Sequence, residues 1–190
     1  QTTNYENNQF NLTLENKDGT TEKHQSEALL YATGRKSNTD TLNLENTSIQ
    51  IDEKSFIIRN ELFETTAKGV YVVGDASGKH MLQHAAAYEV NHLGKILLEE
   101  CTEPLHFKYM PHAVFTEPEI ASVGITEQKA KEKNIKYITS TTNWLASAKA
   151  MSTRLHYPVT KFLINPDNYE ILGCHMIGPE SSTMMHQVLA

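Results

Sequence analysis

The residues best suited to chemistry are Gly74 and Asp75, which come directly after the apolar residues 70–73. A continuous apolar run of this kind is typical of a buried parallel strand. Ligands of open α/β sheets bind beyond the carboxyl ends of such strands. Gly74 has no Cβ and can approach a ligand closely, and Asp75 offers an ionised acceptor for a ligand hydroxyl. The alternative interpretation of Asp75 is an ordinary turn or a helix cap.

A helix of strong helix formers is predicted over residues 85–100, just after this candidate site. Leu82, Gln83 and His84 would lie at its N-terminus. The unpaired backbone N–H groups and the positive dipole end of a helix N-terminus favour an anion. We therefore expect main-chain groups of Gln83 and His84 to face negative charge, although the His84 ring could instead be a cap or a core-edge side chain.

Two other pairs of polar residues could do chemistry but are better explained by structure. His80 and His84 have the spacing of a metal pair on a helix, yet a turn precedes His80 and no third ligand stands out. Glu117 and Glu119 could act as acid and base, but they flank Pro118 and more simply shape a turn. No metal site is expected.

Composition narrows the class of protein. The chain of 190 residues has 17 basic and 23 acidic side chains, and its net charge of -6 disfavours nucleic acid and anionic membranes as partners. No apolar run approaches the roughly 18 residues of a membrane span, and no signal-peptide pattern opens the chain. Cys101 and Cys174 match no redox or zinc spacing, and as buried small hydrophobes they fit a reducing, cytoplasmic compartment.

Three segments occur in a telling order: Ala-Leu-Leu-Tyr-Ala-Thr-Gly-Arg at 28–35, Gly-Val-Tyr-Val-Val-Gly-Asp-Ala at 69–76, and His-Ala-Val-Phe-Thr-Glu-Pro-Glu-Ile-Ala-Ser-Val-Gly-Ile-Thr-Glu at 112–127. Together they resemble the class I pyridine nucleotide–disulfide oxidoreductases, the family of dihydrolipoamide dehydrogenase, glutathione and mycothione reductases and mercuric reductase. The first looks like the return from the NAD domain to the FAD domain, the second like the second FAD motif, and the third like the opening of the dimerisation domain.

The resemblance implies a flavin site. Asp75 would accept a hydrogen bond from a ribityl hydroxyl of FAD, and the helix after His84 would point at the C2 carbonyl and N1 of the flavin, which become negative on reduction. Arg35 could reach the cofactor or a neighbouring carboxylate. The cofactor-binding residues implied are Arg35, Gly74, Asp75, Ala76, Leu82, Gln83 and His84.

Other motifs of the family are not found in this sequence. It has no Gly-x-Gly-x-x-Gly for either nucleotide, no Cys-x-x-x-x-Cys redox pair and no His-Pro-x-x-x-Glu segment with the acid–base histidine. We therefore expect a C-terminal fragment of a larger flavoenzyme, with its catalytic residues outside this chain and no turnover of its own.

The expected architecture has three parts. Residues 1–33 would be a remnant of the NAD-binding domain, with a hairpin at 9–25 and a buried strand at 28–33. With no neighbouring sheet to pack on, these first residues should be disordered or expose an apolar face. Residues 34–103 would be part of an α/β FAD-binding domain. Residues 104–190 would be a truncated α+β dimerisation domain, an antiparallel sheet backed by helices.

The expected parent protein is an FAD-dependent oxidoreductase that uses NADH or NADPH to reduce a small-molecule disulfide, a protein lipoyl group or another thiol-linked substrate. It would be a homodimer, with an apolar interface to which five residues are candidates to contribute: Met176, Ile177, Met184, Met185 and Val188. Two alternatives remain open. The chain by itself could be a non-catalytic self-association module, or the parent could be a transhydrogenase-like flavoprotein without the redox cysteine pair.

Overall fold

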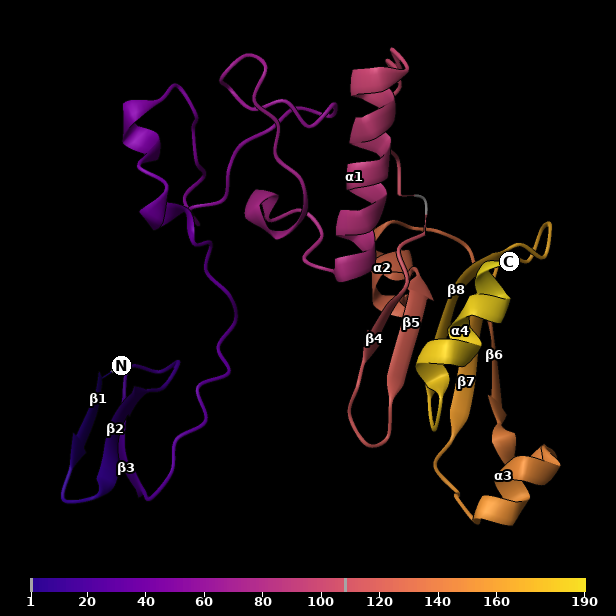
Figure 1. Ribbon diagram of the computed structural model, residues 1–190. Coiled ribbons are helices and arrows are strands. Elements are labelled where there is room, and N and C mark those ends of the chain that lie inside the picture. The colour runs from indigo at the N-terminus through magenta and orange to yellow at the C-terminus, as the bar shows by residue number, and fades with distance from the viewer. Residues whose placement is uncertain (1, 108) are drawn as a thin grey trace. The chain divides into compact units, whose positions relative to one another are not determined.

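The computed structural model describes residues 2–107 and 109–190, and the chain divides into two compact units, residues 1–36 and 37–190 (Figure 1). In the first unit, β1 (Thr2–Glu6), β2 (Gln9–Glu15) and β3 (Thr21–Ser26) form an antiparallel sheet in that order. The predicted hairpin is present as β2 and β3, with Gly19 at φ +81 in its turn, and β1 extends it.

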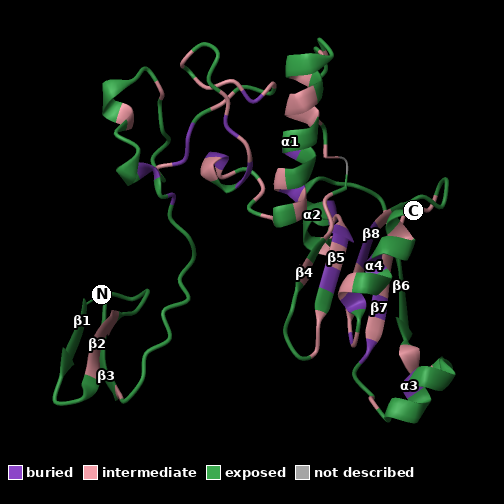
Figure 2. Ribbon diagram, in the orientation of Figure 1, coloured by how far each residue is buried: buried purple, intermediate pink, exposed green. Residues whose placement is uncertain are grey.

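The first unit has almost no core. No residue of its three strands is buried, and Phe10, Leu12 and Leu14 lie half-exposed on one face of β2 (Figure 2). The prediction of a buried strand at 28–33 is wrong, because Leu30 is 88% exposed and this segment pairs with no other described residues. Extended backbone becomes a strand only when a neighbouring strand satisfies its N–H and C=O groups.

Residues 37–82 are mostly turns. They contain three short 3-10 helices, Thr39–Thr41, Leu44–Asn46 and Gly74–Ser77, and three isolated bridges between residue pairs: Ile51 with Ile57, Arg59 with Thr65, and Glu64 with Tyr71. The prediction of a buried parallel strand over residues 70–73 is wrong, because the pairing here is antiparallel and amounts to one isolated bridge, Tyr71 with Glu64. The Val72 N–H donates to the Phe63 carbonyl, and the Val70 carbonyl accepts from the Thr65 N–H. The predicted helix is α1 (Gln83–Leu98), which starts two residues earlier than expected.

The C-terminal part, residues 110–190, confirms the predicted α+β fold. Five antiparallel strands lie in the order β4-β5-β8-β7-β6 (Figure 1). Their bounds are β4 His112–Val114, β5 Ile120–Gly124, β6 Ile138–Asn143, β7 Val159–Ile164 and β8 Ile171–Ile177. The α-helices are α2 (Glu127–Glu132), α3 (Ala148–Thr153) and α4 (Ser181–Leu189), and a 3-10 helix spans Trp144–Ala146. Thr126 caps α2 as expected, because its side chain accepts a hydrogen bond from the Lys129 N–H.

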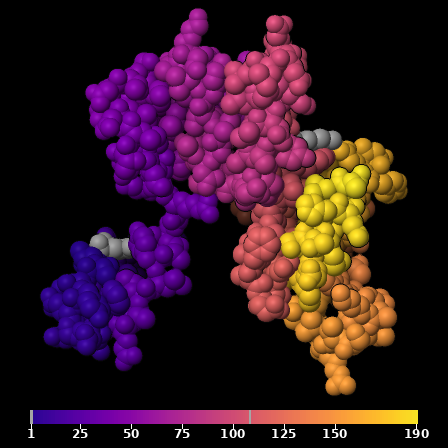
Figure 3. All heavy atoms as spheres, viewed as in Figure 1, coloured from indigo at the N-terminus to yellow at the C-terminus, as the bar shows by residue number. Residues whose placement is uncertain are grey.

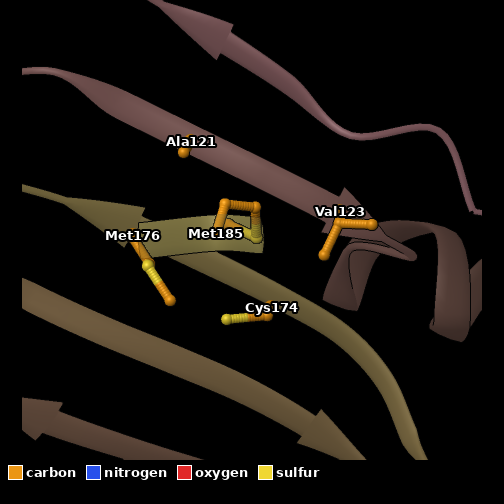
Figure 4. Packing of buried hydrophobic residues seen from close by; sticks show 5 residues of the cluster. All are labelled: Ala121, Val123, Cys174, Met176 and Met185. Carbon is orange, nitrogen blue, oxygen red and sulfur yellow. The ribbon is translucent and has the colours of Figure 1, made fainter. Parts of the chain in front are cut away.

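The core of this part lies between α4 and the centre of the sheet. Figure 3 shows the yellow atoms of α4 against the salmon atoms of the chain near residue 120, and α4 packs on β5 and β8. Figure 4 shows the cluster itself, in which Met185 of α4 meets side chains of β5 and β8. The members of the cluster are Ala121, Val123, Cys174, Met176 and Met185.

This core corrects one expectation about the dimer interface. Met176 is 6% exposed and Met185 is 2% exposed, so both belong to the core of one chain and offer almost no surface to a second copy. Cys174 is also buried, and burial raises the pKa of its thiol to about 11. The thiol is therefore protonated and unreactive at neutral pH, in agreement with the expected role of a small buried hydrophobe.

Candidate functional site

The candidate site is built on a sharp corner of the backbone at Gly74. Val73 is extended, Gly74 has φ +67, and the chain then turns through the 3-10 helix Gly74–Ser77, which Gly78 caps with φ +65. The Ser77 hydroxyl donates to the Gly74 carbonyl at 2.8 Å and holds the turn closed. A Cβ at Gly74 would lie 3.1 Å from the Cβ of Ala86 in α1, so the corner also packs closely on that helix.

The corner leaves Asp75 exposed. Its carbonyl accepts from the Gly78 N–H at 3.0 Å, and the next residue, Ala76, accepts from the Ile57 N–H at 2.9 Å. These hydrogen bonds hold the backbone of both residues in place. The Asp75 side chain can therefore meet a ligand hydroxyl at the surface of a well-held turn.

The N-terminus of α1 follows the corner after a short loop. Leu82 is the N-cap residue, no side chain of the described residues caps this end, and the first turn carries no acidic residue. Gln83 is exposed, whereas the His84 ring is partly buried, with its Nε2 2.7 Å from the Pro111 carbonyl oxygen, to which it donates. The His84 side chain is thus engaged within the protein. The uncapped backbone N–H groups of the first turn, and not this side chain, are suited to bind a negative charge.

A buried carboxylate, missed in the sequence, joins the corner to the helix. Glu89 lies in the second turn of α1 and is 1% exposed. Its Oε2 accepts from the Gly74 N–H at 2.6 Å, and its Oε1 accepts from Nη2 of Arg59 at 2.6 Å. The signal that could have found it is spacing, because Glu89 follows the fully buried Ala85 by four residues and so lies on the packed face of the helix.

Arg59 forms the outer half of this ion pair. Its side chain is 8% exposed and its guanidinium lies 4.5 Å from the ring centroid of Phe63. Its Nε–H is buried and has no acceptor among the described residues. Arg59 and Phe63 also line an open cavity of about 250 Å³, whose lining includes Lys79, His80, His106 and Phe107.

The other candidate residues have different outcomes. Arg35 is exposed and belongs to the unit of residues 1–36, so its contact with the cofactor stays a prediction. His80 precedes α1 and packs its ring edge-on to Phe107, at 5.0 Å between centroids. No three His, Cys, Asp or Glu side chains of the described residues are grouped to hold a metal ion.

Glu117 and Glu119 do not form an acid–base pair. Glu119 Oε2 accepts from both the backbone N–H and the hydroxyl of Ser182, at 3.0 and 2.8 Å, at the start of α4. These bonds hold the pKa of the Glu119 carboxyl below its usual range. Glu117 lies 3.5 Å from the Tyr157 hydroxyl. The two carboxylates therefore have separate hydrogen-bond partners.

Among the described residues, no helix is both long and apolar enough to cross a membrane. Comparison with known proteins then identifies the class. Residues 1–89 match the family described as pyridine nucleotide-disulphide oxidoreductase, and residues 110–190 match the dimerisation domain of the same family. The chain belongs to the class I pyridine nucleotide–disulfide oxidoreductases.

Particular relatives agree with this class. The chain is 32% identical to dihydrolipoyl dehydrogenase of Buchnera aphidicola over 85% of its own length and 34% of that protein. It is 30% identical to mercuric reductase of Staphylococcus aureus over 85% of its length and 30% of the relative. The fold matches the HOCl-induced flavoprotein disulfide reductase RclA of Escherichia coli with a TM-score of 0.86 at 24% identity, covering 98% of this chain and 42% of that structure. The chain thus spans about a third of the length of these curated relatives.

Proposed function

We propose that this chain provides half of the flavin site and the self-association domain of an FAD-dependent, NAD(P)H-linked oxidoreductase that acts on a disulfide or related thiol-linked substrate in the cytoplasm. The observation that carries the proposal is the pairing of two features within one short segment. Asp75 is presented by a closely held corner, and the uncapped N-terminus of α1 follows a few residues later.

The residues present fit the sugar-alcohol arm and ring edge of FAD. Asp75 would accept a hydrogen bond from a ribityl hydroxyl, and Gly74 and Ala76 would shape the turn around it. The first-turn N–H groups at Gln83 and His84, with Leu82 before them, would face the C2 carbonyl side of the ring and favour its negatively charged reduced form. Bound FAD would supply hydride acceptance from NADH or NADPH and electron transfer onward. The chain's own part is to bind, orient and stabilise charge.

The first test is flavin binding by the longer protein that contains this sequence. We expect the purified protein to be yellow and to oxidise NADH or NADPH with a thiol-containing acceptor. We expect Asp75→Ala to weaken FAD about 10- to 100-fold, since a hydrogen bond to a charged group contributes about 1.5–3 kcal/mol. Fluorescence titration of the apoprotein with FAD measures this.

Two comparisons make this test decisive. Glu53→Gln, an exposed carboxylate in a loop of the same part of the chain, should leave FAD affinity unchanged. A colourless protein that releases no flavin on denaturation would refute the proposal. A yellow protein without a Cys-x-x-x-x-Cys pair in its sequence would select the transhydrogenase-like alternative over disulfide reduction.

We also propose that residues 110–190 self-associate into a homodimer. The match to the dimerisation domain supports this, as do apolar side chains left exposed beside the sheet: Phe115 is 82% exposed, and Val114, Ile120 and Met184 are also exposed. We expect sedimentation velocity on the chain to give twice the mass of one copy, and Phe115→Asp to shift it toward monomer. A monomer at high micromolar concentration would contradict this second proposal.

A further inference from the structure

The structure assigns a positioning role to the buried pair of Arg59 and Glu89: we infer that it sets the orientation of the Gly74 corner against the N-terminus of α1. This inference rests on the proposed flavin site, whose two halves are that corner and that helix end. Neither side chain is among the residues that we expect to touch the cofactor. Glu89 acts through the main chain of Gly74, and Arg59 acts through Glu89.

The first argument is connectivity. One carboxylate oxygen of Glu89 receives the Gly74 N–H at 2.6 Å, and the residue that follows is Asp75. Glu89 belongs to α1, so this single bond joins the turn that presents Asp75 to the helix whose first turn would face the flavin ring. A displacement of the Glu89 carboxylate therefore moves Asp75 relative to the helix N-terminus.

The second argument is that the position needs a carboxylate. Gly74 N and Arg59 Nη2 are both donors, and each is bound to a different oxygen of Glu89. An ionised carboxyl group has only acceptors, whereas a glutamine amide has one oxygen and one NH₂ group. Glutamine would place a donor against one of these two donors, although its size and shape hardly differ from those of glutamate.

The third argument is that the pair is itself held. The guanidinium of Arg59 lies on the Phe63 ring, and the Arg59 backbone pairs with that of Thr65. Both side chains are largely shielded from solvent, at 8% and 1% exposed. Because Arg59 is held in place, the Glu89 carboxylate bound to it can take only one orientation. That orientation fixes the position of the Gly74 corner.

The direct test needs no flavin. Amide hydrogen exchange of the 190-residue chain reports the Gly74 N–H, and in Glu89→Gln we expect its exchange to speed up by about tenfold or more. Glu89→Asp, which keeps the charge but withdraws the carboxylate by one methylene, should act in the same direction and serves if the glutamine variant does not fold. Glu119→Gln is the matched control. It removes a carboxylate that also accepts a backbone N–H, that of Ser182, and should leave the Gly74 rate unchanged.

The second readout concerns the cofactor in the longer protein. If the pair positions the site, Glu89→Gln weakens FAD by about tenfold and makes the flavin midpoint potential more negative, because the helix N-terminus no longer faces the charge that develops on reduction. A role in stability alone would leave the affinity and potential of the folded variant unchanged, and that result would overturn the inference.

The two proposals fail in different ways. If the longer protein holds no flavin, the proposed function is wrong, while amide exchange at Gly74 still decides whether Glu89 holds the corner. If flavin binds normally and the Gly74 exchange rate is the same in Glu89→Gln as in the unaltered chain, the proposed function stands and the positioning inference is refuted.

Discussion

Replacing Arg59 with leucine should lower the free energy of unfolding of residues 37–190 by about 3–5 kcal/mol, since breaking a buried pair leaves an uncompensated charge. Here the charge is the Glu89 carboxylate, which is 1% exposed and would keep, among the described residues, only the Gly74 N–H as a donor. The loss should appear as a lower midpoint in urea unfolding followed by circular dichroism.

Two comparison variants identify the cause. Lys161→Met breaks the bond to Glu127, where both side chains are about a third exposed, and should cost no more than about 1 kcal/mol. The double variant Arg59→Leu with Glu89→Leu should recover part of the loss, because no buried charge remains. An Arg59→Leu variant as stable as the unaltered chain would show that this pair does not hold the fold together.

The second large effect is expected at Gly124, where β5 crosses close to β8. Gly124 has φ +76, and a Cβ there would lie 2.2 Å from the Leu172 carbonyl oxygen. Its register partner is Gly173, whose own Cβ would lie 2.2 Å from the Ile125 carbonyl oxygen. Gly124→Ala must therefore move backbone as well as adopt a strained conformation, and we expect a loss of about 3 kcal/mol or more.

Thermal unfolding of the C-terminal part measures this loss. The matched control is Gly94→Ala, since Gly94 lies inside α1 with nothing within 4 Å of an added Cβ. Alanine there should stabilise the chain by about 0.5–1 kcal/mol through its better helix propensity. If Gly124→Ala and Gly94→Ala changed the stability equally, the close approach of β5 and β8 at Gly124 would be contradicted.

Local patterns were enough to predict the elements whose hydrogen bonds are short-range. The N-cap at Thr126, the hairpin around Asp18 and Gly19, and the run of helix formers in α1 each carry their own partners within a few residues. The same reasoning failed at residues 28–33 and 70–73, whose apolar side chains indicated strands. A strand exists only through pairing with distant backbone, and a local pattern does not contain that pairing.

The candidate site shows the same division. Gly74, Asp75 and the start of α1 are adjacent in sequence, so residue types alone pointed to them. The sequence pattern did not single out Glu89, and the expectation that Met185 contributes to a dimer interface was wrong. Both are buried by contacts with residues far along the chain.

The sequence by itself determined the family, the α+β fold and the place of the corner at Gly74, because these depend on residue types at close spacing. Only the tertiary structure decided that Arg59, fifteen residues before the corner, and Glu89, fifteen residues after it, meet there as a buried pair. The physical reason is that a charge is stable in the interior only beside its partner, and that partner is chosen by the path of the folded chain.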